Sequence, residues 1–155
     1  MTNNNTKGIT NKNIIMENYT SLEQSKMLTV FGLDPNTADM FWLKESDASD
    51  DYENVSIPYS ECGDLDVNDG IPCWSTGALI ELLPSEIWKD KTMYPLVIVK
   101  RNDCYCVEYN ANVIPLIGFA KPTLIEALIS VYLWVSENGY MEKMEQQNYS
   151  VCVKK

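Results

Sequence analysis

The spacing of apolar residues along the chain predicts three helices, over residues 21–31, 76–83 and 122–137. In each range apolar positions recur three and four residues apart, which places them on one face of a helix. Thr20 stands where the first helix needs a capping residue, and Ser75 stands at the same point of the second. The third helix has the widest apolar stripe, so we expect it to pack most deeply in the core.

Runs rich in β-branched and aromatic residues predict a small, mainly antiparallel sheet. The longest pair of such runs predicts a hairpin over about 94–110, with a compact turn at 101–103. Two short strands are expected near 40–43 and 55–59, and Pro58 would confine the second of them to an edge of the sheet.

Two stretches between these elements are expected to be irregular. Residues 110–120 contain Pro115 and Gly118, which favours a connecting loop with apolar contents. Residues 85–88 follow a proline and are interpreted as one helical turn or an irregular crossing.

These elements together predict an α+β protein in which the sheet packs against three helices. A chain of 155 residues suits one domain, because a globule of that size buries about 70% of the surface that the unfolded chain exposes. Residues 1–15 are rich in Asn, Thr and Lys and are assigned to a disordered extension, whereas 16–155 form the single α+β domain.

The net charge of −10 comes largely from one segment, residues 45–69. It contains nine carboxylates and no Lys or Arg: Glu45, Asp47, Asp50, Asp51, Glu53, Glu61, Asp64, Asp66 and Asp69. A field of this sign repels phosphate backbones, which argues against direct binding of nucleic acid by this surface. It favours a basic protein partner or a cation, and the alternative is a solvated acidic loop.

The chain contains no histidine, which excludes catalysis by imidazole and His-ligated zinc or haem. Its five cysteines do not form an even disulfide framework and are interpreted as reduced thiols in a cytoplasmic protein. The longest apolar run, 124–135, is interrupted by Glu126 and Ser130 and is far shorter than the roughly 20 residues that cross a membrane. We therefore expect no membrane partner and no cofactor.

One calcium candidate is present, formed by Asp64, Asp66, Asn68 and Asp69 ahead of a glycine. Alternating oxygen ligands followed by a glycine turn can wrap Ca²⁺. The spacing departs from an EF-hand, because the glycine is one position late and the twelfth position is a serine instead of a bidentate Glu. An ordinary Asx-rich turn explains the pattern as well.

The cysteines offer two further candidates. Cys104 and Cys106 with Cys62 and Cys73 could supply four thiolates for zinc, but only one pair is closely spaced, and alternation along a strand explains that spacing without metal. Cys73 stands near the start of the second helix, where a thiolate is favoured, yet the chain has no histidine to serve as its base. We accordingly predict no catalytic residue.

Aromatic residues are the stronger candidates for function. The chain has four Trp and nine Tyr, and these residue types dominate protein interfaces. Trp42, Tyr52 and Trp88 are the candidate interface residues. The alternative is that large rings fill a core that has only three phenylalanines.

Several blocks of the sequence resemble a group of small proteins encoded in prophages and mobile elements of gut anaerobic bacteria. They are the run Tyr19-Thr20-Ser21-Leu22-Glu23-Gln24-Ser25-Lys26, the turn Thr37-Ala38-Asp39-Met40, the block Pro72-Cys73-Trp74-Ser75 with Leu82-Leu83-Pro84, and the Pro122 helix with Trp134. The resemblance spans about residues 19–139. It implies an intracellular accessory protein and supplies no catalytic residues.

Three hypotheses for function follow. The first is a non-enzymatic accessory protein that binds a basic protein partner or a second copy of itself through an aromatic and acidic surface. The second is a metal-binding protein or an enzyme that uses the carboxylates of 64–69. The third is an acidic mimic of nucleic acid that occupies the binding site of another protein.

Overall fold

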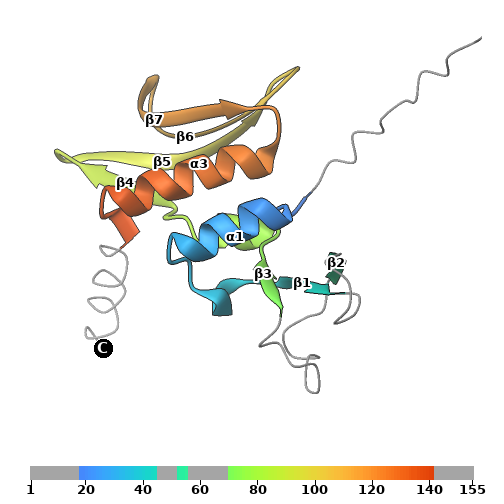
Figure 1. The fold of residues 1–155 in the computed structure, drawn as a ribbon. Coiled ribbons are helices and arrows are strands. Elements are labelled where there is room, and N and C mark those ends of the chain that lie inside the picture. The colour runs from blue at the N-terminus through green and yellow to red at the C-terminus, as the bar shows by residue number, and fades with distance from the viewer. Residues whose placement is uncertain (1–17, 45–51, 56–69, 142–155) are drawn as a thin grey trace, which may run out of the picture.

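The structure, a computed structural model, describes residues 18–44, 52–55 and 70–141 (Figure 1). This part of the chain contains three α-helices and two antiparallel sheets, so the α+β class expected from the sequence is confirmed. The helices are α1 (Leu22–Val30), α2 (Thr76–Glu81) and α3 (Leu124–Glu137), with a short 3₁₀ helix at Pro35–Thr37.

The predicted strands are divided between two sheets instead of forming one. The first has the order β2-β1-β3, with bounds β1 (Met40–Lys44), β2 (Tyr52–Val55) and β3 (Ile71–Cys73). The second has the order β4-β5-β6-β7, with bounds β4 (Glu86–Lys89), β5 (Thr92–Lys100), β6 (Tyr105–Ala111) and β7 (Ile114–Lys121). Helix α3 packs against one face of this second sheet (Figure 1).

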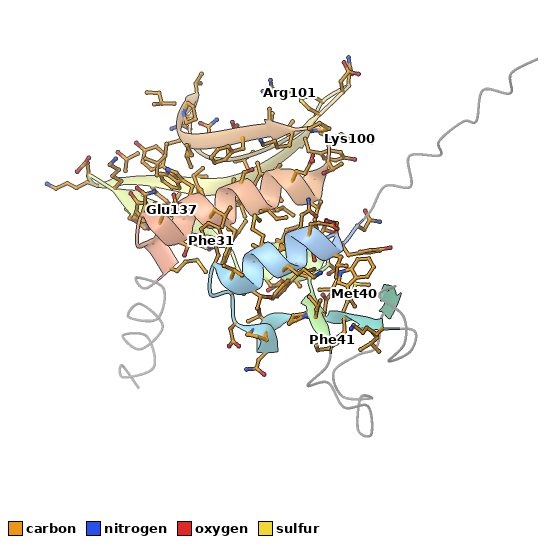
Figure 2. All side chains as sticks on the ribbon, viewed as in Figure 1. Phe31, Met40, Phe41, Lys100, Arg101 and Glu137 are labelled. Atoms are coloured by element: carbon orange, nitrogen blue, oxygen red, sulfur yellow. The ribbon has the colours of Figure 1, made fainter. Side chains whose placement is uncertain are left out.

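One contiguous hydrophobic core joins these elements. Leu128, Val131 and Val135 of α3 are fully buried, and they share the core with Val107 and Tyr109 of β6. Leu28 of α1, Trp74 just ahead of α2, and Leu79 of α2 complete the core, all with no exposed surface. Figure 2 shows side chains between the layers, with Lys100 and Arg101 at one end of the second sheet and Glu137 toward the other. The predicted deep packing of the last helix is confirmed.

The helix starts differ from the sequence prediction in two respects. The N-cap of α1 is Ser21, whose hydroxyl accepts from the Gln24 backbone while the Gln24 side chain accepts from the Ser21 backbone. The predicted cap, Thr20, is instead fully buried. The last helix is capped by Thr123 and begins two residues after the predicted start at 122.

Two strands lie where irregular chain was expected. Residues 86–89 form β4, which joins β5 through the two-residue turn Asp90-Lys91. Residues 114–121 form β7, which joins β6 through the two-residue turn Asn112-Val113. All four turn residues have positive φ, as a type I′ hairpin turn requires.

The expected strand near 55–59 is found earlier, at 52–55, and residues 56–59 lie outside the described part of the chain. The expected extension 1–15 and most of the acidic segment also lie outside it.

The chain ahead of α1 is fixed to the start of α2. The carbonyl of Asn18 accepts from the Thr76 backbone at 2.8 Å, and the Thr20 backbone donates to the Trp74 carbonyl at 2.9 Å. Ser75 caps α2 as predicted, and its backbone N–H donates to the Asp39 carboxylate at 2.8 Å. Residues 18–39 are therefore held against the middle of the chain by polar contacts.

Candidate interaction surface

Four large apolar side chains are exposed at one end of the β4-β5-β6-β7 sheet. They are Trp88, Met93, Val113 and Ile114, which are 51%, 42%, 91% and 71% exposed, and we call them the hairpin-tip surface. The β4–β5 and β6–β7 turns lie at the same end of the sheet, opposite the β5–β6 turn (Figure 1). Strand pairing therefore brings together residues that are up to 26 positions apart in sequence.

The alternation of β4 and β5 directs Trp88 and Met93 to the solvent. Ile87 and Tyr94 oppose each other and pack on the core, so the next pair, Trp88 and Met93, lies on the other face. The Trp88 indole donates to a Glu86 carboxylate oxygen at 2.8 Å, which holds the ring along the strand. The indole N–H, the only donor of the side chain, is thus satisfied, and the apolar face of the ring remains exposed to water.

The β6–β7 turn presents Val113 in a conformation that valine disfavours. Asn112 has φ 59°, which asparagine tolerates, but Val113 has φ 126°. The Val113 backbone N–H donates to the Asn110 side chain at 3.1 Å, which closes the turn. Residues in sparsely populated conformations cost on the order of 1–3 kcal/mol and are concentrated at functional sites.

The three aromatic residues predicted as interface candidates do not come together. Trp88 belongs to the hairpin-tip surface, whereas Trp42 and Tyr52 lie on the other sheet, in β1 and β2. Trp42 is partly buried, meets the Tyr19 ring edge-on at 6.0 Å, and donates to the Thr20 carbonyl at 3.3 Å. The side chain of Tyr52 lies outside the described part.

The sequence prediction missed Met93, Val113 and Ile114. Val113 and Ile114 form an aliphatic pair directly after Asn110-Ala111-Asn112, so the signal was two apolar residues at a polar turn. That signal becomes visible only when 110–120 is interpreted as a hairpin instead of a loop.

The metal candidates are not assembled in the part that the structure describes. Asp64, Asp66, Asn68 and Asp69 all lie outside it, and within 18–44, 52–55 and 70–141 no group of three His, Cys, Asp or Glu side chains could hold an ion. Of the four cysteines considered for zinc, Cys62 also lies outside.

The described cysteines have ordinary structural surroundings. Cys73 is fully buried, with its thiol 3.4 Å from the Thr20 carbonyl oxygen to which it donates. Cys106 is buried in β6, and Cys104 precedes that strand. Desolvation and the neighbouring Cys106 raise the pKa of the Cys104 thiol, which disfavours the reactive thiolate.

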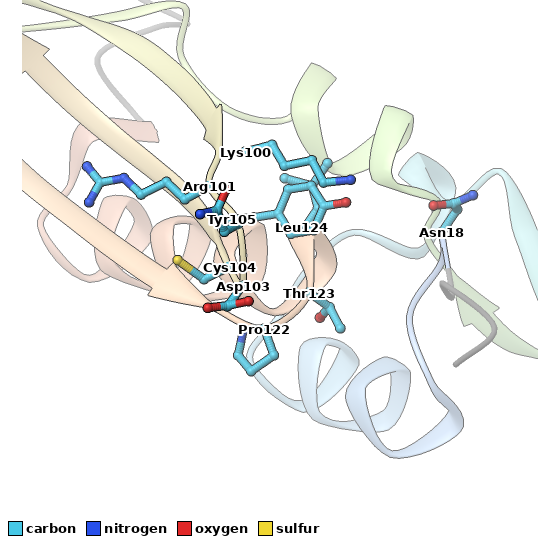
Figure 3. Close-up of a pocket in the computed structure, with 10 residues that line it drawn as sticks. Asn18, Lys100, Arg101, Asp103, Cys104, Tyr105, Pro122, Thr123 and Leu124 are labelled. Carbon is cyan, nitrogen blue, oxygen red and sulfur yellow. The ribbon is translucent and has the colours of Figure 1, made fainter. Parts of the chain in front are cut away.

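A small pocket lies between the β5–β6 turn and the start of α3 (Figure 3). It has a volume of about 200 Å³, below the roughly 300–1,000 Å³ of typical small-molecule sites. Lys100 lies 5.5 Å from the centre of the Tyr105 ring, and Figure 3 shows Arg101 directed away from Lys100. A shallower hollow of about 450 Å³ lies between Met27 of α1 and Leu133 of α3.

The described helices include none that is both long and apolar enough to cross a membrane. No protein-family model, curated protein or solved structure matches the chain.

Proposed function

We propose that this protein is a non-enzymatic accessory protein that binds another protein through the hairpin-tip surface. The observation that supports this proposal is the exposure of Trp88, Met93, Val113 and Ile114 at one end of a single sheet. Trp88 and Met93 lie on the face turned away from the core, whereas Ile114 pairs with Ala111 and so lies on the face that Tyr109 shares. The hairpin-tip surface is therefore a group of exposed apolar side chains around one end of the sheet, and large exposed apolar surfaces mark interaction sites.

The composition of the surface suits a protein partner. Tryptophan and methionine are enriched at interfaces, and a central tryptophan is a frequent hot spot of binding energy. Val113 is the second residue of a two-residue turn and Ile114 is the first residue of β7, and so short a connection limits the entropy lost on binding.

The charge of the chain favours a basic partner. A net charge of −10 attracts a positively charged protein over distances of about 8–10 Å at physiological salt, which speeds association. The resemblance to prophage and mobile-element proteins supports a role in the bacterial cytoplasm as an accessory to such an element.

The test compares two variants of the full chain. Ile114→Asp places a charge on the hairpin-tip surface, and Val30→Asp places the same charge on the 87% exposed Val30 at the end of α1. Partners are first identified by crosslinking in the bacterium that carries the gene, and binding is then measured with the purified partner. We expect Ile114→Asp to weaken binding at least tenfold, about 1.4 kcal/mol, and Val30→Asp to leave it unchanged.

Equal affinity of the Ile114→Asp variant and the original protein would contradict the proposal, provided that both show the same circular dichroism. The metal-binding and nucleic-acid-mimic hypotheses depend on carboxylates outside the described residues. A calcium titration that raises the melting temperature would favour the metal hypothesis over the one proposed.

A further inference from the structure

Strand β5 extends well beyond its neighbour β4. Glu86, the first residue of β4, pairs with Pro95, and Ser85 accepts from the Leu96 backbone at 2.9 Å. From Val97 to Lys100, β6 is the only described strand that pairs with β5. Among the residues that the structure describes, about half of β5 is therefore an edge of the sheet.

The direction of the backbone groups along this edge follows from two hydrogen bonds. The Leu96 N–H points to the β4 side, and the Arg101 N–H points to the opposite side, where it donates to the Cys104 carbonyl at 2.8 Å. Because these directions alternate along a strand, Ile98 and Lys100 direct both N–H and C=O to the open edge.

The sequence of this edge favours pairing with another strand. Val97, Ile98 and Val99 are consecutive β-branched residues, and Ile98 and Val99 are 39% and 38% exposed. Exposed apolar edge strands are templates for adding a strand, and proteins usually protect them with charges or prolines. Here a single Lys100 stands at the end of the strand.

We propose that a second copy of this chain pairs with this edge, antiparallel to the first across a two-fold axis at Val99. In this register Val99 opposes Val99 and Ile98 opposes Lys100, and the pairing ends there because Ser85, the residue before β4, already lies opposite Leu96. Ile98 and Lys100 of the two copies then exchange both of their outward groups, which forms four backbone hydrogen bonds.

Charge complementarity supports the second copy as the occupant. No like charges stand directly opposite each other in this register, because Lys100 faces Ile98, and the two Lys100 side chains are diagonal neighbours. Glu86 lies on the same face of the sheet as Val97, since it pairs with Pro95. Ser85, whose carbonyl accepts from the Leu96 backbone, fills the position next to Glu86 in this row, so the pairing between the two copies ends at Lys100, where β5 ends. The long side chain of the partner's Arg101 lies on the same face as Glu86 and reaches toward it past Ser85.

The dimer would join two four-stranded sheets into one of eight strands. Because the strands run in opposite directions across the two-fold axis, the two hairpin-tip surfaces would lie at opposite ends of the assembly. This inference rests on the β5 edge and holds whether or not the hairpin-tip surface binds a partner.

Sedimentation of the full chain tests the assembly. We expect the measured mass to rise with concentration to that of a dimer. Ile98→Pro removes an outward backbone N–H from each copy, so this variant should keep the mass of a monomer. Ala120→Pro is the matched control, because the same alternation gives Ala120 an outward N–H on the far edge of β7, and this variant should still dimerise.

A cysteine at the axis tests the register independently of any effect of proline on folding. Opposed residues of a non-hydrogen-bonded pair have Cα atoms about 4.5 Å apart, which permits a disulfide. Under mild oxidation Val99→Cys should give a crosslinked dimer through position 99, identified by peptide mapping, and Ala120→Cys should not. The proposal is overturned if the original protein stays monomeric at high micromolar concentration or if Val99→Cys crosslinks no more than Ala120→Cys.

A charge exchange tests the contact between Glu86 and Arg101. Arg101→Glu should weaken the dimer about fivefold, because each of two exposed ion pairs contributes under 1 kcal/mol. Adding Glu86→Arg to the same chain should restore it. A double variant as weak as the single one would overturn the register centred on Val99.

Discussion

Val113 is a residue whose side chain and backbone conformation conflict. Replacing it with glycine should raise the free energy of unfolding by about 1 kcal/mol, because glycine adopts φ 126° without the steric cost that a β-branched residue meets. Urea denaturation measures the change. The control is Val30→Gly in the last turn of α1, which should lower stability by about 0.5 kcal/mol. A loss at both positions would show that Val113 carries no strain.

Tyr109 is a buried residue whose ionisation should be visible in the stability of the protein. Its hydroxyl donates to the Pro84 carbonyl at 2.7 Å, and burial raises its pKa far above the ordinary value, as burial also raises the pKa of Tyr132. Above about pH 10 the unfolded chain loses these protons while the folded protein keeps them. The free energy of unfolding should therefore be constant below pH 10 and fall as the pH rises further, by up to about 1.4 kcal/mol per unit for each tyrosine.

Tyr109→Phe separates this residue from the other tyrosines. The variant should lose about 1–2 kcal/mol at neutral pH, because the Pro84 carbonyl is left without its donor. Its alkaline decline should be shallower than that of the original protein. If the free energy of unfolding, measured in urea, falls equally steeply above pH 10 in the variant and in the original protein, the assignment to Tyr109 is contradicted.

At the scale of elements, Thr20 connects α1 to the chain entering α2. Its hydroxyl accepts from the Trp74 backbone at 3.0 Å and shares a hydrogen bond with the Ser25 hydroxyl at 2.7 Å, in a site without exposed surface. Thr20→Val keeps the shape but leaves two buried polar groups unpaired, so we expect a loss of about 2 kcal/mol. Thr92→Val, at an exposed strand start, should change stability by less than about 0.5 kcal/mol. Thermal or urea unfolding of both variants decides whether the network stabilises the fold.

The helices could be predicted from the sequence because their signals are local. Each predicted range overlaps the observed helix, since apolar spacing and a capping hydroxyl lie within a few neighbouring residues. The sequence predicted Thr20 as the cap of α1, and the cap is its neighbour Ser21. Thr20 is buried because its hydroxyl bonds the Trp74 backbone, a contact far along the chain that local sequence does not show.

Strands β4 and β7 were not predicted because their turns lack glycine and their runs are short or contain Pro115 and Gly118, whereas the long β-rich runs on both sides of 101–103 indicate a hairpin without a glycine. A two-residue hairpin usually shows Asn-Gly or Asp-Gly, and here the second position is Lys91 or Val113. Gly118 and Pro115 were interpreted as signs of a loop, but both have a place within the strand. A Cβ at Gly118 would meet the Glu108 Cβ at 3.0 Å, so the glycine permits close approach of β6, and Pro115 lies beside a register shift.

At the scale of the whole molecule, the candidate surface could be predicted only in part. Trp88 was identified because tryptophan is common at interfaces, but Trp42 satisfies the same rule and is partly buried. Exposure is a property of the assembled sheet, and the sequence does not show that the two turns lie at the same end.

The boundary of the domain can be tested by truncation. The described contacts of the core begin at Asn18, so removal of residues 1–15 should leave the free energy of unfolding unchanged within about 0.5 kcal/mol. Removal of residues 1–20 should destabilise the protein strongly, because it also deletes Thr20 and the Asn18 carbonyl that accepts from Thr76. A large effect of the shorter deletion in urea unfolding would place the boundary earlier than residue 16.

The contact between Thr20 and Trp74 sets an order of events during synthesis. The two residues are 54 positions apart, so Thr20 is polymerised roughly 3–10 seconds before its partner at the usual rate of about 5–20 residues per second. Strands β5, β6 and β7 and helix α3 follow one another in the chain and can associate as soon as they leave the ribosome. During that interval the apolar face of α1, centred on Leu28, lacks the residues that cover it in the fold, so the nascent segment around α1 is exposed to chaperones longer than the strands and helix that follow.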